Sequence, residues 1–307
     1  MAQQNYRVKN DLGMWLRSAT VVDEASKIIL LSHGQLVTKI ADTDNPEWWQ
    51  VSAKVHDEDQ TGFCKHALMV PDADFQPAPG ANKIIAVDLK RTAPVTRNQQ
   101  GTEAFMLNEQ PHPSRDPNAA TSEKVTALGE IISWLAVSTS LRYKKTTDTF
   151  CNIYAYDYCR LAGVFMPRVW WTKEAIAKLQ AGEVVSPVYG KTIDEVTANQ
   201  LAQDEPVNWF RNFGYLFGWR RTNDLTELQR AANNGQVCLI NAAKHPGHGH
   251  ICAVAPETAE HTAQWNPAHD QVMRPLLSQA GSLNFEYRPY VWWGPAYTNL
   301  GFWIHDD

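Results

Sequence analysis

The sequence lacks a paired set of cysteines and a long apolar run, and each absence excludes a class of protein. Its 307 residues include five cysteines, and an odd number at irregular spacings is not a disulfide framework. No CxxC pair indicates a zinc site. No run approaches the ~18 apolar residues of a membrane-spanning helix, so we expect no insertion into a membrane.

The sequence also lacks a strong excess of charge. The formal net charge is -5 at pH 7, which is not the basic signature of a nucleic-acid-binding protein. The opening residues, MAQQNYRVKNDLG, contain no apolar segment of a secretory signal, so we expect no ordinary signal peptide. Hydrophobic residues make up 44% and charged residues 20% of the chain, a balance typical of a globular protein with a substantial core.

Residues 5 to 70 have the pattern of short β-strands. Runs of Val, Ile, Leu, Thr and Trp alternate with turn-forming segments such as DNPE and HDEDQTG. Several short strands in this length predict a small β-barrel, which we place at residues 1–72. A proline-rich stretch follows at residues 73–120, with one strand-like run, KIIAVDL. Because prolines favour extended segments, we interpret it as a connector that lies along the neighbouring domain.

From residue 121 onward, helical patterns precede strand patterns, the order of an α+β domain. Apolar residues at helical spacing begin after Thr121 and Ser122, either of which can cap a helix. CNIYAYDYCRLAG predicts a second helix, and NDLTELQRAANNG predicts a third, capped by Asn223 or Asp224. QVCLINA and HICAVAP predict a β-hairpin, and PLLSQAGSLNF predicts a further strand.

Cys151 begins the second predicted helix. In the first turn, its thiol would lie near unpaired backbone N–H groups and the positive end of the helix dipole. Both favour the thiolate, which is the nucleophile, and the N–H groups could also bind an oxyanion. We interpret Cys159, Cys238 and Cys252 as core residues and place Cys64 in the small barrel, with buried thiols as the general expectation. Asp157 and Arg160, further along this helix, could contact a substrate, but we interpret them as a solvated face.

The segment KHPGHGHICAV contains three histidines that could act as the base for Cys151. His250 begins the second strand of the predicted hairpin, a rigid position, whereas His245 and His248 lie in the loop. We therefore predict that His250 takes the thiol proton. Three histidines could instead hold a metal, but their spacing is not a common zinc pattern, and we expect no metal and no cofactor.

A third residue must orient the imidazole through its other ring nitrogen. Gln279, in the next predicted strand, is the first candidate. Asn284, Glu257 and His261 are the alternatives. Twelve tryptophans are many for this length; among them Trp170, Trp171, Trp209, Trp219, Trp292 and Trp293 could line a groove, although core packing is the more frequent use.

DTFCNIYAYDYCRLAGV resembles the fDCSGfvqyvyrkaGi motif of the NlpC/P60 cysteine peptidases, a papain-like family. Cys151 matches its nucleophile, and His250, in GHGHICAV, matches its catalytic histidine. GWRRTND, SQAGSLNFEY and GFWIHDD resemble a phage-associated and effector-like branch, so the resemblance covers about residues 145 to 307. Phe-Cys-Asn-Ile replaces the usual Asp-Cys-Ser-Gly. In the family the third polar residue lies on the strand after the histidine, whereas here an insertion, ETAEHTAQWNPAHDQVMR, separates His250 from Gln279.

The first 72 residues resemble a bacterial SH3 (SH3b) domain. LGMWLRSAT, SHGQLVTKI, EWWQVSA and TGFCKHALM match its successive segments. The whole would then be an N-terminal SH3-like barrel, a connector and a papain-like α+β domain at residues 121–307. The alternative for the first part is an unrelated small barrel.

The resemblance implies a peptidoglycan hydrolase that cleaves an amide bond of the stem peptide, of the γ-D-glutamyl endopeptidase type. Tyr143 matches a substrate-site tyrosine of the family, and we assign Asn152, Trp171 and His248 to substrate binding with it. We expect action on the cell wall or periplasm after lysis, phage delivery or dedicated secretion. The alternatives are a papain-like toxin, transferase or deamidase acting on another amide, and a catalytically dead wall-binding protein.

Overall fold

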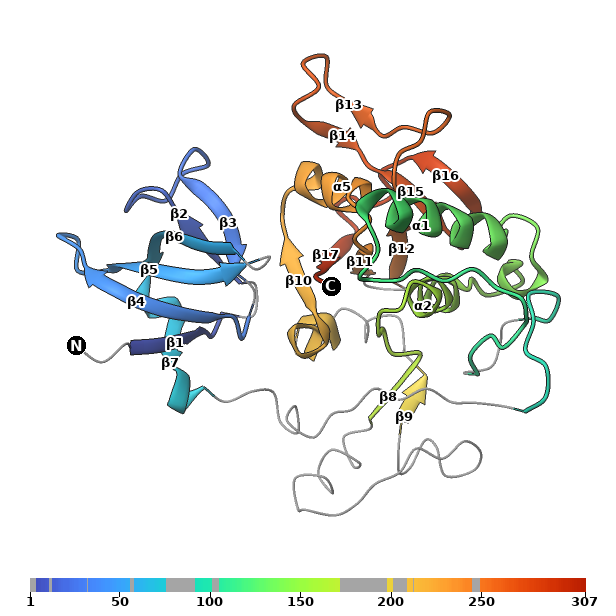
Figure 1. Ribbon diagram of the computed structural model, residues 1–307, viewed down its shortest axis with the longest axis horizontal. Helices are drawn as coiled ribbons and strands as arrows, with labels where there is room; N and C mark the ends of the chain where they lie inside the picture. The colour runs from blue at the N-terminus through green and yellow to red at the C-terminus, as the bar shows by residue number, and fades with distance from the viewer. Residues whose placement is uncertain are drawn as a thin grey trace.

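The protein contains both helices and strands. Most strands form two large sheets, and the helices pack around the second of them (Figure 1). The computed structural model describes residues 4–10, 13–31, 33–55, 58–75, 92–100, 105–171, 198–200, 209–211, 213–244 and 249–307. The strand-like run KIIAVDL in the connector lies outside these ranges. No helix in these ranges is both long and apolar enough to cross a membrane.

The N-terminal part is a curled antiparallel sheet, a half-barrel that is open between β3 and β7. Its seven strands are ordered β3-β2-β6-β5-β4-β1-β7. They are β1 (Gln4–Val8), β2 (Met14–Arg17), β3 (Lys27–Leu31), β4 (Leu36–Asp42), β5 (Trp48–Val55), β6 (Glu58–Lys65) and β7 (Met69–Pro71). Alternate residues of β5, Val51, Ala53 and Val55, are buried in the concave core, as the period of two in a strand requires.

The second part is built on a six-stranded antiparallel sheet of order β10-β17-β11-β12-β15-β16. These strands are β10 (Trp219–Thr222), β11 (Cys238–Lys244), β12 (His250–Val254), β15 (Leu276–Gln279), β16 (Phe285–Pro289) and β17 (Tyr297–His305). The predicted hairpin is confirmed: β11 and β12 pair from Cys238 with Val254 to Ala242 with His250. Two short ladders stand apart from this sheet, β8 (Val169–Trp171) with β9 (Ala198–Gln200) and β13 (Gln264–Trp265) with β14 (Val272–Arg274).

Helices cover both faces of this sheet. They are α1 (Thr121–Leu135), α2 (Cys151–Leu161) and α5 (Leu225–Asn233). On one face, Leu239 and Ile251 join the apolar side chains of α1 and α2. On the other face, Ile240 and Cys252 join those of α5. Because side chains of a strand alternate in direction, β11 and β12 are apolar on both faces and form the centre of this domain.

The part of the connector at residues 105–120 packs on the α1 and α2 side of the chain. Met106 and Leu107 are buried in the core of α1 and α2. Arg115 donates to the carbonyl oxygens of Gly235, at 2.8 Å, and Ala162, at 3.1 Å, and it pairs with Asp307.

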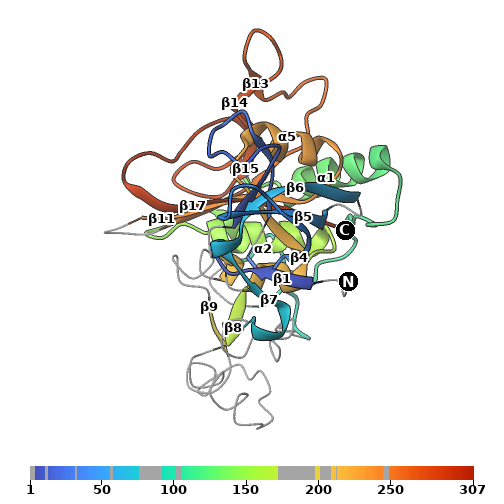
Figure 2. The same ribbon diagram turned by 90° about the vertical axis from the view of Figure 1, so that its left-hand side faces the viewer.

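The curled sheet stands beside the β10 edge of the six-stranded sheet and not over its faces (Figures 1 and 2). The ring of Tyr215 lies so close to Gly34 that an added Cβ would be 2.8 Å from it. Glycine leaves room for the tyrosine ring because it has no side chain. It also adopts the positive φ of +79° at this turn without strain.

The two helix starts differ in how their N–H groups are satisfied. The N-cap of α1 is Ala120 and not Thr121 or Ser122. Glu123 reaches back to accept the N–H of Ala120 at 3.0 Å. The N-cap of α5 is Asp224, one of the two predicted residues, and its carboxylate accepts the N–H of Thr226 at 2.7 Å.

Replacing Asp224 with alanine should lower the free energy of unfolding by about 1 kcal/mol, because the N–H of Thr226 loses its acceptor. Urea denaturation at constant pH measures the change. Asn223→Ala, at the exposed neighbouring position, is the matched control and should change stability little. Equal losses in the two variants would contradict the capping role.

Candidate active site

Cys151 lies where the helical pattern predicts it, at the first residue of α2. Its side chain is largely covered, and the residue is 7% exposed. The first N–H groups of a helix have no partner within the helix, and the helix dipole is positive at this end. The helix start therefore surrounds the sulfur with groups that stabilise a negative charge.

His250 is the first residue of β12, and Gln279 is the last residue of β15. The Nε2 atom of His250 lies 2.9 Å from Oε1 of Gln279. The amide nitrogen of Gln279 donates to the carbonyl oxygen of Leu283 at 3.0 Å, which turns Oε1 toward the imidazole. Since Oε1 can only accept, Nε2 carries the proton in this bond, and Nδ1 remains for the thiol.

Cys151 and His250 form a hydrogen-bonded pair. Burial raises the pKa of the Cys151 thiol, but the hydrogen bond and charge of His250 and the N–H groups of Ile251 and Asn152 outweigh it. The pKa of Cys151 therefore lies below its ordinary value. Burial lowers the pKa of His250, but its bonds to Cys151 and Gln279 leave that pKa above its ordinary value. Both shifts favour a thiolate–imidazolium ion pair.

A glycine makes room for this imidazole. An added Cβ at Gly281 would lie 3.0 Å from Cε1 of His250 and 3.5 Å from Nε2 of Gln279. The N–H of Gly281 donates to Oδ1 of Asn284 at 2.8 Å, which holds the loop after β15 in place. The sequence motif QAG thus has a steric role beside the orienting glutamine.

The three alternatives to Gln279 are engaged elsewhere. Asn284 donates to the carbonyl oxygens of Val137 and Tyr143, at 3.1 and 2.8 Å. Glu257 accepts from the backbone of Ala263 and from the side chains of Asn233 and Trp265. His261 stacks on Tyr287 with the ring centroids 4.4 Å apart. Of the four candidates, Gln279 is the one for which the described structure gives a bond to His250.

Tyr143 does not lie where a substrate could reach it. It is 0% exposed, and its hydroxyl donates to Asp157 at 2.9 Å. Arg142 donates to the same carboxylate at 2.6 Å. Asp157 is 1% exposed, so its interpretation as part of a solvated helix face is wrong. This cluster joins the turn before Cys151 to the body of α2. Asp157 is buried because Arg142 and Tyr143 pair with its charge there.

The other predicted substrate residues fall in different places. Asn152 is half-buried, and its side-chain oxygen accepts the N–H of Ile153 at 3.0 Å. Trp171 ends β8, at a position where the structure describes the backbone and not the side chain. His245 and His248 lie outside the described residues. Within the described ranges, no group of three or more His, Cys, Asp or Glu side chains gathers as a metal site would require.

The four remaining cysteines are buried, which confirms their interpretation as core residues. Burial raises the pKa of Cys64 and of Cys252 to about 12, and it raises the pKa of Cys159 and of Cys238 as well. Cys151 is therefore distinguished from the other thiols by its environment. Trp209 and Trp219 are buried core residues too, each 1% exposed.

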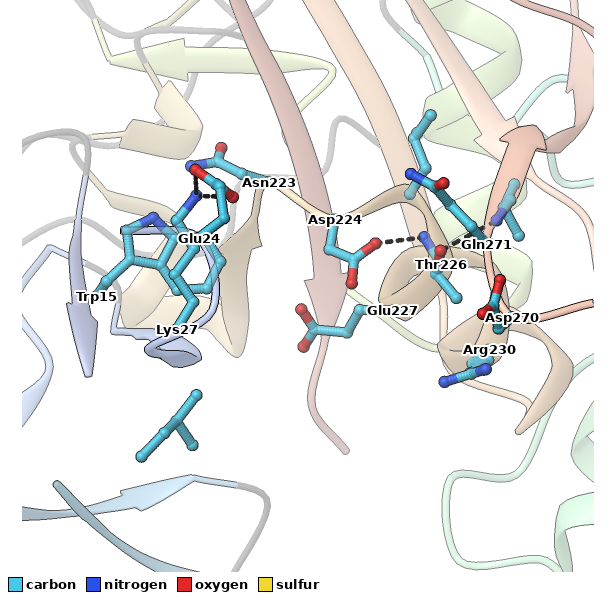
Figure 3. Close-up of a pocket in the computed structure, with 13 residues that line it drawn as sticks. Trp15, Glu24, Lys27, Asn223, Asp224, Thr226, Glu227, Arg230, Asp270 and Gln271 are labelled. Carbon is cyan, nitrogen blue, oxygen red and sulfur yellow. Dashed lines mark hydrogen bonds and ion pairs between the residues drawn. The ribbon is translucent and has the colours of Figure 1, made fainter. Parts of the chain in front are cut away.

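A separate cavity of about 560 Å³ opens between the curled sheet and α5 (Figure 3). Trp15 and Lys27 form one wall, and Asp224, Glu227 and Arg230 stand on the other. Its described lining contains no cysteine and no histidine. The cavity is therefore separate from the Cys151–His250 pair.

Comparison with protein-family models, with curated proteins and with solved structures finds no match to this chain.

Replacing Asp157 with leucine should lower the free energy of unfolding by about 3–5 kcal/mol, because the buried Arg142 is left without its partner. Urea denaturation followed by circular dichroism measures the loss. The double variant Asp157→Leu with Arg142→Met removes both charges and should recover a large part of the stability. A double variant as unstable as Asp157→Leu alone would contradict the ion-pair explanation.

Alkylation of Cys151 by iodoacetamide should remain fast at pH 6 in the wild-type protein, because a lowered thiol pKa leaves thiolate present below the ordinary range. In His250→Ala, the rate should fall about tenfold for each pH unit below an ordinary thiol pKa of about 8.5. Peptide mass spectrometry reads Cys151 separately from the other thiols. Identical pH profiles for the two proteins would exclude the ion pair.

Proposed function

We propose that this protein is a papain-like cysteine hydrolase that cleaves an amide bond of the peptidoglycan stem peptide. The observation that carries the proposal is the position of His250, which bonds to the Cys151 thiol on one side and to Gln279, at 2.9 Å, on the other. A nucleophile, a base and a residue that orients the base are the parts that covalent acyl transfer requires.

In the proposed mechanism, the Cys151 thiolate attacks the amide carbonyl carbon and a C–S bond forms. The N–H groups at the start of α2 donate hydrogen bonds to the carbonyl oxygen as negative charge develops on it. His250 gives its proton to the leaving nitrogen, the C–N bond breaks, and the amine departs from a thioester. Water then attacks the thioester while His250 takes its proton. The C–S bond breaks, and the acid leaves with the thiolate–imidazolium pair restored.

Gln279 has a positioning role in this scheme. Its amide is neutral, so it holds the proton on Nε2 without competing with Cys151 for the positive charge of the imidazolium. The bond from its own nitrogen to Leu283 keeps the acceptor oxygen turned toward the ring. The imidazole therefore presents Nδ1 to the sulfur through the whole cycle.

The choice of peptidoglycan as substrate is supported by the resemblance of both halves of the chain. The segments around Cys151 and His250 resemble NlpC/P60 peptidases, and the curled N-terminal sheet occupies the region that resembles an SH3b domain. We propose a γ-D-glutamyl endopeptidase type of cleavage, with the SH3b-like part contacting the wall. Access to this substrate would follow lysis, phage delivery or dedicated secretion.

The wild-type protein should lower the turbidity of purified peptidoglycan and release fragments with a new amino terminus, detected by mass spectrometry. Cys151→Ala should reduce this release to background because no thioester can form. Cys159→Ala is the matched control, since Cys159 is buried in the same helix and has no part in the mechanism.

Full activity in Cys151→Ala would remove the assignment. Release of ammonia without new amino termini would identify a deamidase instead. A wild-type protein that binds peptidoglycan, leaves it uncut and shows no selective alkylation of Cys151 would be a wall-binding protein.

A further inference from the structure

Cys252 is a buried thiol that the proposed mechanism does not use. It lies in β12, two residues after His250. The two residues are close enough along the strand for one side chain, that of Trp292, to contact both. Cys252 is 0% exposed, and nothing in the acyl-transfer cycle requires a second sulfur at this position.

Trp292 joins Cys252 to His250. Its indole Nε1–H donates to the Cys252 sulfur at 3.2 Å. The same indole stands perpendicular to the imidazole of His250, with ring centroids 4.7 Å apart and planes at 88°. This edge-to-face arrangement is one of the two that aromatic rings prefer. The indole ring thus contacts His250, while the indole nitrogen bonds to Cys252 on the same strand.

Trp292 does not belong to a strand, since it lies between the end of β16 at Pro289 and the start of β17 at Tyr297. It is half-buried. The rings of Trp293 and Tyr297 pack against its indole, with ring centroids 5.5 and 5.1 Å away. The hydrogen bond to Cys252 fixes this loop side chain to the same strand that carries the base.

We propose that Cys252 is a positioning residue: its sulfur holds the indole of Trp292 against His250 and so keeps the imidazole directed at Cys151. This role rests on the proposed function, because it assigns the base to His250. Among the residues that the structure describes, the groups that face the imidazole are Cys151 from α2, Gln279 from β15, Gly281 from the following loop and Trp292 from the loop before β17. Of these, Cys151 is the one that carries charge.

The physical consequence follows from geometry. Gln279 fixes one ring nitrogen of His250 but leaves the imidazole free to pivot about that bond. Trp292 restricts the pivot because its ring stands against the imidazole at a right angle. If the indole loses its acceptor, it can turn toward solvent, and the hydrogen bond from His250 to the Cys151 thiolate weakens. Less thiolate then forms at low pH.

The test is the pH profile of Cys151 alkylation by iodoacetamide in Cys252→Ala and Cys252→Ser. At pH 6, Cys252→Ala should react about threefold to tenfold more slowly than wild type, the range expected for the loss of one hydrogen bond. Above pH 9 the two should react alike, because the thiolate then forms without help. Cys252→Ser should restore most of the rate, since a hydroxyl oxygen also accepts an N–H.

Cys238→Ala is the matched control. Cys238 is equally buried and belongs to the same apolar cluster as Cys252, so its replacement leaves a similar cavity. It should leave the alkylation profile unchanged. If Cys252→Ala does not fold, Trp292→Phe removes the same hydrogen bond from the other side and should show the same slowing at pH 6.

A wild-type rate at pH 6 in Cys252→Ala or in Trp292→Phe would overturn the proposal, as would a serine variant as slow as the alanine variant. Equal slowing by Cys238→Ala would also overturn it, because the effect would then come from a cavity. The measurement needs no peptidoglycan. A protein that leaves peptidoglycan uncut but shows the expected profiles would refute the substrate and retain the positioning role.

Discussion

The packing of α2 against β12 is the contact on which the candidate site depends. It brings the first residue of a helix, Cys151, to the first residue of a strand, His250. Ionising either residue alone would be unfavourable, because burial disfavours the charged form of both. As a pair they neutralise each other, and the N–H groups at the helix start favour the thiolate further. Burial also strengthens the attraction between the two charges, because little water is present to screen it.

The imidazole is held from several directions by groups of different chemistry. Gln279 fixes its proton, Gly281 leaves room for its edge, and Trp292 stands against its ring. These residues come from β15 and from two loops. Beneath α2, the buried cluster of Arg142, Tyr143 and Asp157 joins the turn before Cys151 to the helix. In this preorganised setting the pKa of Cys151 is lowered, whereas burial raises the pKa of the four core thiols.

Local sequence patterns were sufficient for several parts of this site. The helix from Cys151, the hairpin strand from His250 and the cap at Asp224 all depend on neighbouring residues and on the period of the element. The place of Gln279 in the next predicted strand makes it the first candidate for the orienting residue, and the structure puts it against the imidazole. The prediction of a solvated Asp157 is wrong because its partners, Arg142 and Tyr143, lie 15 and 14 residues away along the chain. Periodicity carries no information about such partners.

The sequence by itself determined which residues start the two elements of the site, because caps, apolar periods and turn residues act within a few positions along the chain. The tertiary structure alone decided that Asp157 is buried, that Gly281 touches the base and that Trp292 links His250 to Cys252. These contacts depend on how helix, sheet and loops pack together, and packing is set by the whole fold rather than by any one segment.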